Sequence, residues 1–115
     1  MARARLDVKV RLIWRDERAM GPGKADLLDQ IILAGSISGA AKTMKMSYSR
    51  AWSLVEVMNC AFKSPLVEAA PGGVRGGGAV VTELGLHVLS AYRAMQQAVE
   101  REAVAHLPAF QKLLK

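Results

Sequence analysis

The hydrophobic and polar positions follow two different periods along the chain. From residue 6 to residue 14 every second position is apolar and mostly charged residues fall between, which predicts a half-buried strand. The segment 15–23 is polar and contains glycine and proline, and it breaks this alternation. Apolar residues at spacings of three and four then predict a helix over 24–34, with Gly35 as its C-terminal cap.

Two further helices are predicted close together. Ser36 or Ser38 is expected to cap a short helix built on the small residues 39–41. After a short turn, Ser47 is expected to cap a longer helix, whose apolar residues form one narrow stripe at about 100° per residue. Helix, short turn and helix have the spacing of a helix-turn-helix, here over about 38–62.

The second half of the chain predicts a hairpin and a long helix. Short apolar segments on either side of a glycine-rich stretch predict two strands over about 66–81, the wing of a winged helix-turn-helix. Thr82 is expected to cap a helix over about 82–105, which is longer than a small domain needs to cover its core. Its apolar stripe either completes that core or makes a dimer contact, and we favour dimerisation because paired DNA half-sites demand two-fold symmetry. The stripe consists of Leu84, Val88, Tyr92, Met95 and Val99.

The 115 residues suffice for one domain, which we assign to 1–115. Its class is mainly α with a small β-sheet (α+β): a winged helix-turn-helix with an N-terminal strand, a two-stranded wing and a long C-terminal dimerisation helix. The net charge of +6 suits a polyanionic partner. A single cysteine excludes an internal disulfide and a cysteine-rich zinc site, and no apolar run approaches a membrane span, so we expect a cytoplasmic protein.

Hydrogen-bonding side chains gather at the start of the longer helix of the helix-turn-helix. Side chains there reach base edges when such a helix lies in the major groove, whereas the competing interpretation is a solvated helix face. Arg50 is expected to contact a guanine, and the wing is expected to approach the minor groove or phosphates. The predicted DNA-binding residues are Ser38, Lys42, Lys45, Ser47, Tyr48, Ser49, Arg50, Ser53, Arg75, Gly76 and Gly77.

Other candidate chemistry is weak. Trp52 flanks the apolar stripe and either faces DNA or packs against the wing, and we favour packing. The glycine-rich stretch matches no nucleotide-binding motif, and Ile37 stands where a nucleophile elbow would need serine. His87 and His106 are far apart in the sequence and Cys60 is remote from both, so no metal site is predicted. We therefore do not expect an enzyme.

An ordered set of short motifs carries a family resemblance. The motifs are Gly21-Pro22-Gly23-Lys24, Gly35-Ser36-Ile37-Ser38, Ala40-Ala41-Lys42, Ser47-Tyr48 with Ala51-Trp52, Met58-Asn59, Gly72-Gly73 with Gly76-Gly77-Gly78-Ala79, and Thr82 with Gly85. Over roughly residues 6–95 the chain resembles the N-terminal DNA-binding domain of ModE-type, molybdate-dependent regulators. The family usually has glycine where Lys45 stands, and a non-glycine residue held left-handed there would cost about 1 kcal/mol.

The resemblance implies a LysR-like winged helix-turn-helix that binds double-stranded DNA at a palindromic operator as a homodimer. The family's molybdate sites lie in a C-terminal domain without a counterpart in these residues, so no cofactor is implied and a separate protein is the expected sensor of any effector. We predict a sequence-specific transcriptional regulator of a stand-alone kind, linked to molybdenum metabolism. The alternative is a winged-helix module that contacts only other proteins.

Overall fold

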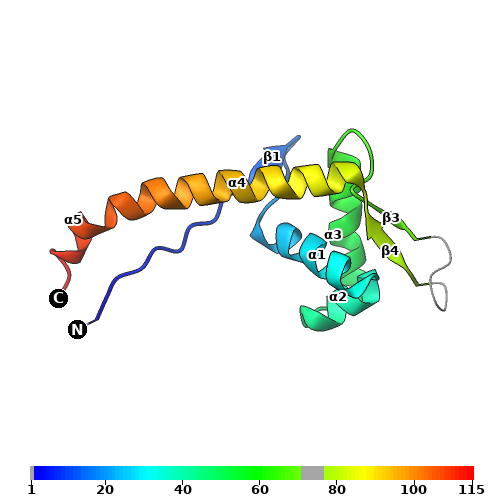
Figure 1. The fold of residues 1–115 in the computed structure, drawn as a ribbon, viewed down its shortest axis with the longest axis horizontal. Coiled ribbons are helices and arrows are strands. Elements are labelled where there is room, and N and C mark those ends of the chain that lie inside the picture. Colours follow the sequence, from blue (N-terminus) through cyan, green and yellow to red (C-terminus); the bar gives the residue numbers. More distant parts are fainter. Residues whose placement is uncertain (1, 71–76) are drawn as a thin grey trace.

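The computed structural model describes residues 2–70 and 77–115. Figure 1 shows α1, α2 and α3 gathered on one side of the long helix α4, with the hairpin of β3 and β4 projecting beside α3. The predicted class, α-rich with small antiparallel strand pairs, is confirmed. The elements are β1 (Leu12–Trp14), β2 (Glu17–Met20), α1 (Pro22–Ala34), α2 (Ile37–Thr43), α3 (Tyr48–Ala61), β3 (Val67–Ala69), β4 (Ala79–Val81), α4 (Glu83–Ala105) and α5 (Leu107–Gln111).

The helices begin and end where local chemistry satisfies their free backbone groups. Helix α1 starts with a proline and ends at Gly35, whose φ of 71° is left-handed as a glycine cap requires. Of the two serines considered for α2, Ser36 is the cap, and its Oγ accepts a hydrogen bond from the Gly39 amide at 3.0 Å. Ser47 and Thr82 cap α3 and α4 in the same way, as predicted.

The N-terminal region differs from the prediction. Residues 2–11 form no strand, and the strand pairing begins only at Leu12, where β1 forms an antiparallel hairpin with β2. The two turn residues, Arg15 and Asp16, have φ values of 51° and 64°, as a tight two-residue hairpin requires. Because neither turn residue is glycine, the sequence gave no signal for a hairpin at this position, and β2 was missed.

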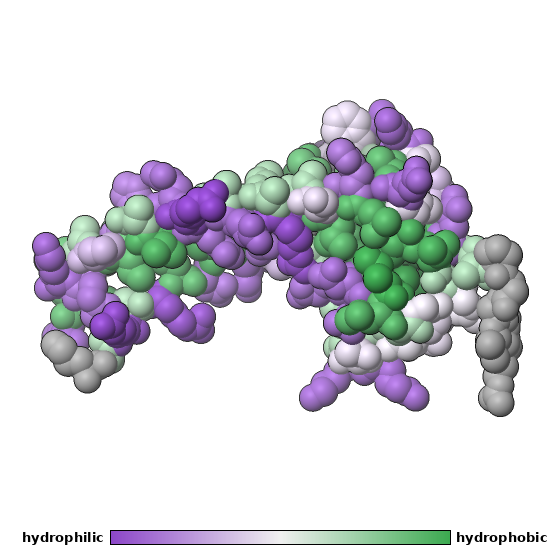
Figure 2. Space-filling model, viewed as in Figure 1, coloured by the Kyte–Doolittle hydropathy of each residue, from purple (hydrophilic) through white to green (hydrophobic). Residues whose placement is uncertain are grey.

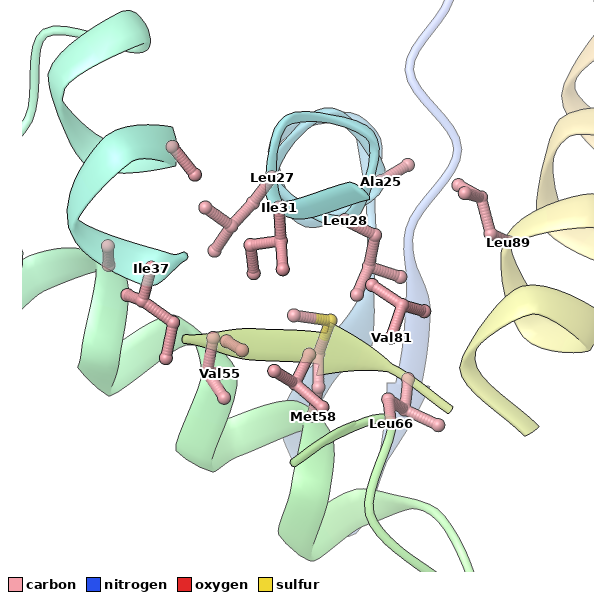
Figure 3. Close-up of a cluster of buried hydrophobic side chains, with 14 of the residues drawn as sticks. Ala25, Leu27, Leu28, Ile31, Ile37, Val55, Met58, Leu66, Val81 and Leu89 are labelled. Carbon is pink, nitrogen blue, oxygen red and sulfur yellow. The ribbon is translucent and has the colours of Figure 1, made fainter. Parts of the chain in front are cut away.

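The core lies between the three short helices, the wing strands and the start of α4. Figure 3 shows Leu27, Leu28 and Ile31 of α1 directed towards Val55 and Met58 of α3, and all five are at most 1% exposed. The stripe predicted on α3 therefore faces the core. Burial of large apolar side chains of this kind contributes about 1.5–3 kcal/mol each.

Asn59 fastens the wing to the end of α3. Its Oδ1 accepts hydrogen bonds from the amides of Leu66 and Val67 at 2.8 and 3.1 Å, and its Nδ2 donates to the Val67 carbonyl at 3.0 Å. Thr82 adds a bond from its hydroxyl to the Pro65 carbonyl at 2.8 Å. Strand β3 therefore leaves α3 in a fixed direction before it pairs with β4.

Helix α4 continues well beyond the core, and the N-terminal segment runs beside it (Figure 1), giving dimensions of 57 × 30 × 22 Å. The Tyr92 hydroxyl donates to the Val10 carbonyl at 2.7 Å, which holds this segment. Arg93 joins α4 to α1 through Asp26 and Asp29 at 2.9 and 2.7 Å. None of the helices in the described part of the chain is both long and apolar enough to cross a membrane.

Candidate nucleic-acid interface

The first two turns of α3 present a polar surface. The Ser47 hydroxyl is occupied as the helix cap, since it accepts from the Arg50 amide at 3.1 Å. Ser49, Arg50 and Ser53 are exposed, and Tyr48 is 56% exposed. Because Ala51, Val55 and Met58 bury the opposite face, Ser49, Arg50 and Ser53 point outward from the domain. The helix can therefore offer donors, acceptors and one guanidinium to a ligand that lies across its N-terminal end.

Helix α2 and the following turn add positive charge beside this surface. Ser38 and Lys42 are exposed on α2, and the hydroxyl of Ser36, not that of Ser38, is engaged in capping. Lys45 is exposed and has a φ of 57°, so the left-handed turn conformation expected of the family is present without a glycine. This conformation costs a non-glycine residue about 1–2 kcal/mol.

A groove of about 280 Å³ separates α3 from the wing strands and brings several predicted residues together. Ser38, Tyr48 and Gly77 all line it. Trp52 also lines it and is 44% exposed, so its indole lies at the surface beside the wing and is not part of the buried core. Arg75 and Gly76, the remaining predicted wing residues, lie outside the described residues.

The outer face of the second half of α3 borders an apolar groove instead of a polar surface. Glu56 and Cys60 line an apolar groove between α3 and the β1–β2 hairpin, together with Trp14. Ser53, one of the predicted DNA-binding residues, also lines this groove. Among the described residues, no group of three or more histidine, cysteine or acidic side chains is arranged to hold a metal ion.

The opposite flank of α3 lies beside three basic residues that the sequence did not assign to a site. Arg50 lines a second cavity together with Arg11, Arg18 and Lys24, which come from three other parts of the chain. Lys24 was noticed only as part of a glycine-rich motif, because no spacing rule joins residues so far apart in the sequence. Burial, together with the positive charges of Arg18 and Arg50, lowers the pKa of Lys24 below its ordinary value, and Glu17 partly offsets this.

The predicted dimerisation stripe divides into two parts. Tyr92 is buried, and Leu84 and Val88 are partly buried against the core of the same chain. Met95 and Val99 lie further along α4 and are 40% and 39% exposed. The first part thus completes the monomer core, as the alternative interpretation held, and the second part is open to a partner.

Exposed apolar surface also occurs on α1. Ile32 is 47% exposed and Leu33 is 77% exposed. Figure 2 shows hydrophobic surface gathered over α1 on the side facing the viewer, between α4 and the wing.

The arrangement of these elements defines a class of protein domain, the winged helix-turn-helix. Helices α2 and α3 form the helix-turn-helix, and β3 and β4 form the wing. The fold superposes on the CbnR_DBD-DNA complex with a TM-score of 0.59, at 17% identity, over 76% of this chain and 94% of that chain. Full-length LysG from Corynebacterium glutamicum, an LTTR, gives a TM-score of 0.53 at 28% identity, over 76% of this chain and 28% of that chain.

Sequence comparison gives the particular relation. The chain is 42% identical over 90 residues to the molybdenum-pterin-binding protein MopB of Rhodobacter capsulatus, covering 78% of this chain and 33% of that protein. It is 36% identical over 96 residues to the molybdenum transport protein ModE of Azotobacter vinelandii, covering 84% and 33%. It is 40% identical over 80 residues to ModE of Escherichia coli K12, a DNA-binding transcriptional dual regulator, covering 70% and 30%.

The chain is a ModE-like winged helix-turn-helix domain, homologous to the N-terminal region of the ModE proteins, and the resemblance seen in the sequence is confirmed. It spans about a third of the length of these curated relatives. No protein-family model matches it.

Proposed function

We propose that this chain is the DNA-binding unit of a transcriptional regulator linked to molybdenum metabolism and that it has no catalytic role. The observation that carries the proposal is the exposed polar N-terminal end of α3, placed between the wing groove and a flank of basic residues. The names of the ModE relatives support the regulatory role, and the likeness to a DNA complex supports the partner.

In the proposed complex, α3 enters the major groove and Arg50 contacts a guanine, the commonest specific contact of an arginine. Lys42 and Lys45, with Ser38, hold the DNA backbone. Phosphate neutralisation supplies much of the affinity, so binding weakens steeply as salt rises.

The proposed regulator acts as a homodimer on a palindromic operator. The support is the exposed pair Met95 and Val99 on the part of α4 that extends past the core. Because a two-fold dimer places two recognition helices on successive half-sites, it also explains how so small a surface gains specificity.

The proposal is tested by comparing Arg50→Ala with Lys42→Ala. We expect Arg50→Ala to relax sequence preference by about 1–3 kcal/mol at one base pair, and Lys42→Ala to weaken all sequences alike. Fluorescence anisotropy with specific and scrambled duplexes measures both effects. Unchanged binding in both variants would remove α3 from its assigned role.

A second candidate function is a protein-interaction module. The observation that favours it is the exposed apolar strand β1, in which Leu12, Ile13 and Trp14 are 46%, 53% and 52% exposed. An electrophoretic mobility assay at low salt separates the two, since the absence of any shifted band would favour the module.

A further inference from the structure

The basic cavity beside α3 is formed by four separate parts of the chain. Lys9 and Arg11 come from the segment before β1, Arg18 from β2, Lys24 from the first turn of α1 and Arg50 from the first turn of α3. The cavity has a volume of about 310 Å³, at the lower end of the range for ligand pockets. Its other lining residues carry no charge: Met20, Gly21, Pro22, Gly23, Met46 and Leu54.

The positive charges of this cavity are poorly compensated by the protein itself. Of the five cations that line this cavity, only Lys9 has a carboxylate of the described residues within 4.0 Å, that of Asp7 at 3.8 Å. Lys24 is only partly exposed and lies in the field of Arg18 and Arg50. Like charges so arranged repel one another and destabilise the folded state, and a bound anion would remove that repulsion.

We propose that this basic cavity binds a tetrahedral oxyanion of the phosphate class. The guanidinium groups of Arg11, Arg18 and Arg50 can donate to the oxygens of such an anion, and the ammonium groups of two lysines add point charges. Gly21, the cap of α1, has no side chain to block the amide groups of the first turn. An aromatic or apolar ligand does not fit, because five of the eleven lining residues are cationic.

Two sources can supply this chemistry. Arg50 and Leu54 lie on the flank of α3 that adjoins the outward-facing Ser49 and Ser53. A duplex lying on that outer surface would bring a backbone phosphate to the mouth of the cavity, in which case the inference rests on the proposed DNA-binding function. A free inorganic or organic phosphate would occupy the same groups without DNA.

The first experiment titrates inorganic phosphate into the free protein by isothermal calorimetry at constant ionic strength. We expect one saturable site with a dissociation constant of about 1 mM or tighter. Lys24→Met, which keeps the aliphatic stem, should weaken binding at least about tenfold, and Lys24→Arg should retain it. Lys112→Met removes the same charge from the exposed C-terminal tail and serves as the matched control.

No saturable site in the wild type, or equal binding by Lys24→Met and Lys112→Met, would overturn the proposal. A second measurement, the salt dependence of DNA binding, distinguishes the sources. The slope compared is that of the logarithm of the binding constant against the logarithm of the salt concentration. If its magnitude is lower by about one in Lys24→Met, a DNA phosphate is the occupant. An unchanged slope, with phosphate binding still lost, identifies a free anion. If the chain binds phosphate but no DNA, only the proposed function fails.

Discussion

Gly85 occupies a position on α4 where no side chain fits. A methyl group built there would collide with the carbonyl oxygen of Leu66 and would lie 2.6 Å from Cγ1 of Val81. This close approach places the start of α4 against Leu66, just before β3, and against Val81 of β4. Glycine is therefore required here for space, although its φ is not left-handed.

We expect Gly85→Ala to lower the free energy of unfolding by about 1–3 kcal/mol, because a buried backbone must shift to admit the methyl group. Urea denaturation followed by circular dichroism measures the change. Gly23→Ala is the control, since nothing lies within 4 Å of a methyl group at that helical position. A neutral Gly85→Ala would show that the start of α4 has room to move.

At the scale of elements, the N-terminal segment depends on α4 for its position. Burial, followed by the charges of Asp26 and Glu100, raises the pKa of Tyr92 above its ordinary value of 10.0, although Arg93 and Arg11 oppose this. Its hydroxyl is the donor to Val10 and must stay protonated to keep that hydrogen bond.

We expect Tyr92→Phe to cost about 0.5–1.5 kcal/mol of unfolding free energy at neutral pH and to speed amide exchange in β1. Because the unfolded phenol ionises first, the wild type should lose stability as the pH rises from about 10 through the raised pKa. The variant lacks this contribution. Denaturation curves should therefore give a difference in unfolding free energy between the two proteins at about pH 8 and a smaller difference at about pH 11. An equal difference at both pH values would contradict this account.

The elements differ in how far the sequence predicts them. Helices α1, α3 and α4 were predicted closely, because each has an apolar stripe and a cap whose chemistry is local. The β1–β2 hairpin was not, because Arg15 and Asp16 adopt left-handed conformations without the glycine that normally signals them. Of the strand predicted over 6–14, only the last three residues form one. The part over 6–11 does not, because alternation alone does not supply a pairing partner, and these residues have none in the described structure.

The candidate site also has one part that the sequence predicts and other parts that depend on tertiary contacts. The polar start of α3 follows from its stripe, since the face opposite a buried stripe must be exposed. Asn59 and the basic cavity were not assigned structural or binding roles, because their partners come together only through tertiary contacts. The surface position of Trp52 depends on the placement of the wing, which periodicity does not define.

On the scale of the whole molecule, α4 leaves a compact domain and carries exposed apolar residues away from it. If that extension is the dimer contact, Met95→Glu combined with Val99→Glu should convert a homodimer into a monomer. Burying two carboxylates against a partner is costly. Analytical ultracentrifugation measures the mass, and Gln97→Glu, on the opposite side of α4, is the matched control. A wild type that is monomeric at all concentrations would exclude the contact.

The three hydrogen bonds of Asn59 have a mechanical consequence for the complete molecule. They fix the separation between the end of α3 and the first wing strand, so these two elements form one rigid unit. In the proposed complex with DNA, a duplex whose groove spacing differs from this separation must itself bend or change groove width. The energetic cost of misfit then falls on the nucleic acid, and it varies with local base-step stiffness. Sequence preference is consequently expected at base pairs that no side chain touches.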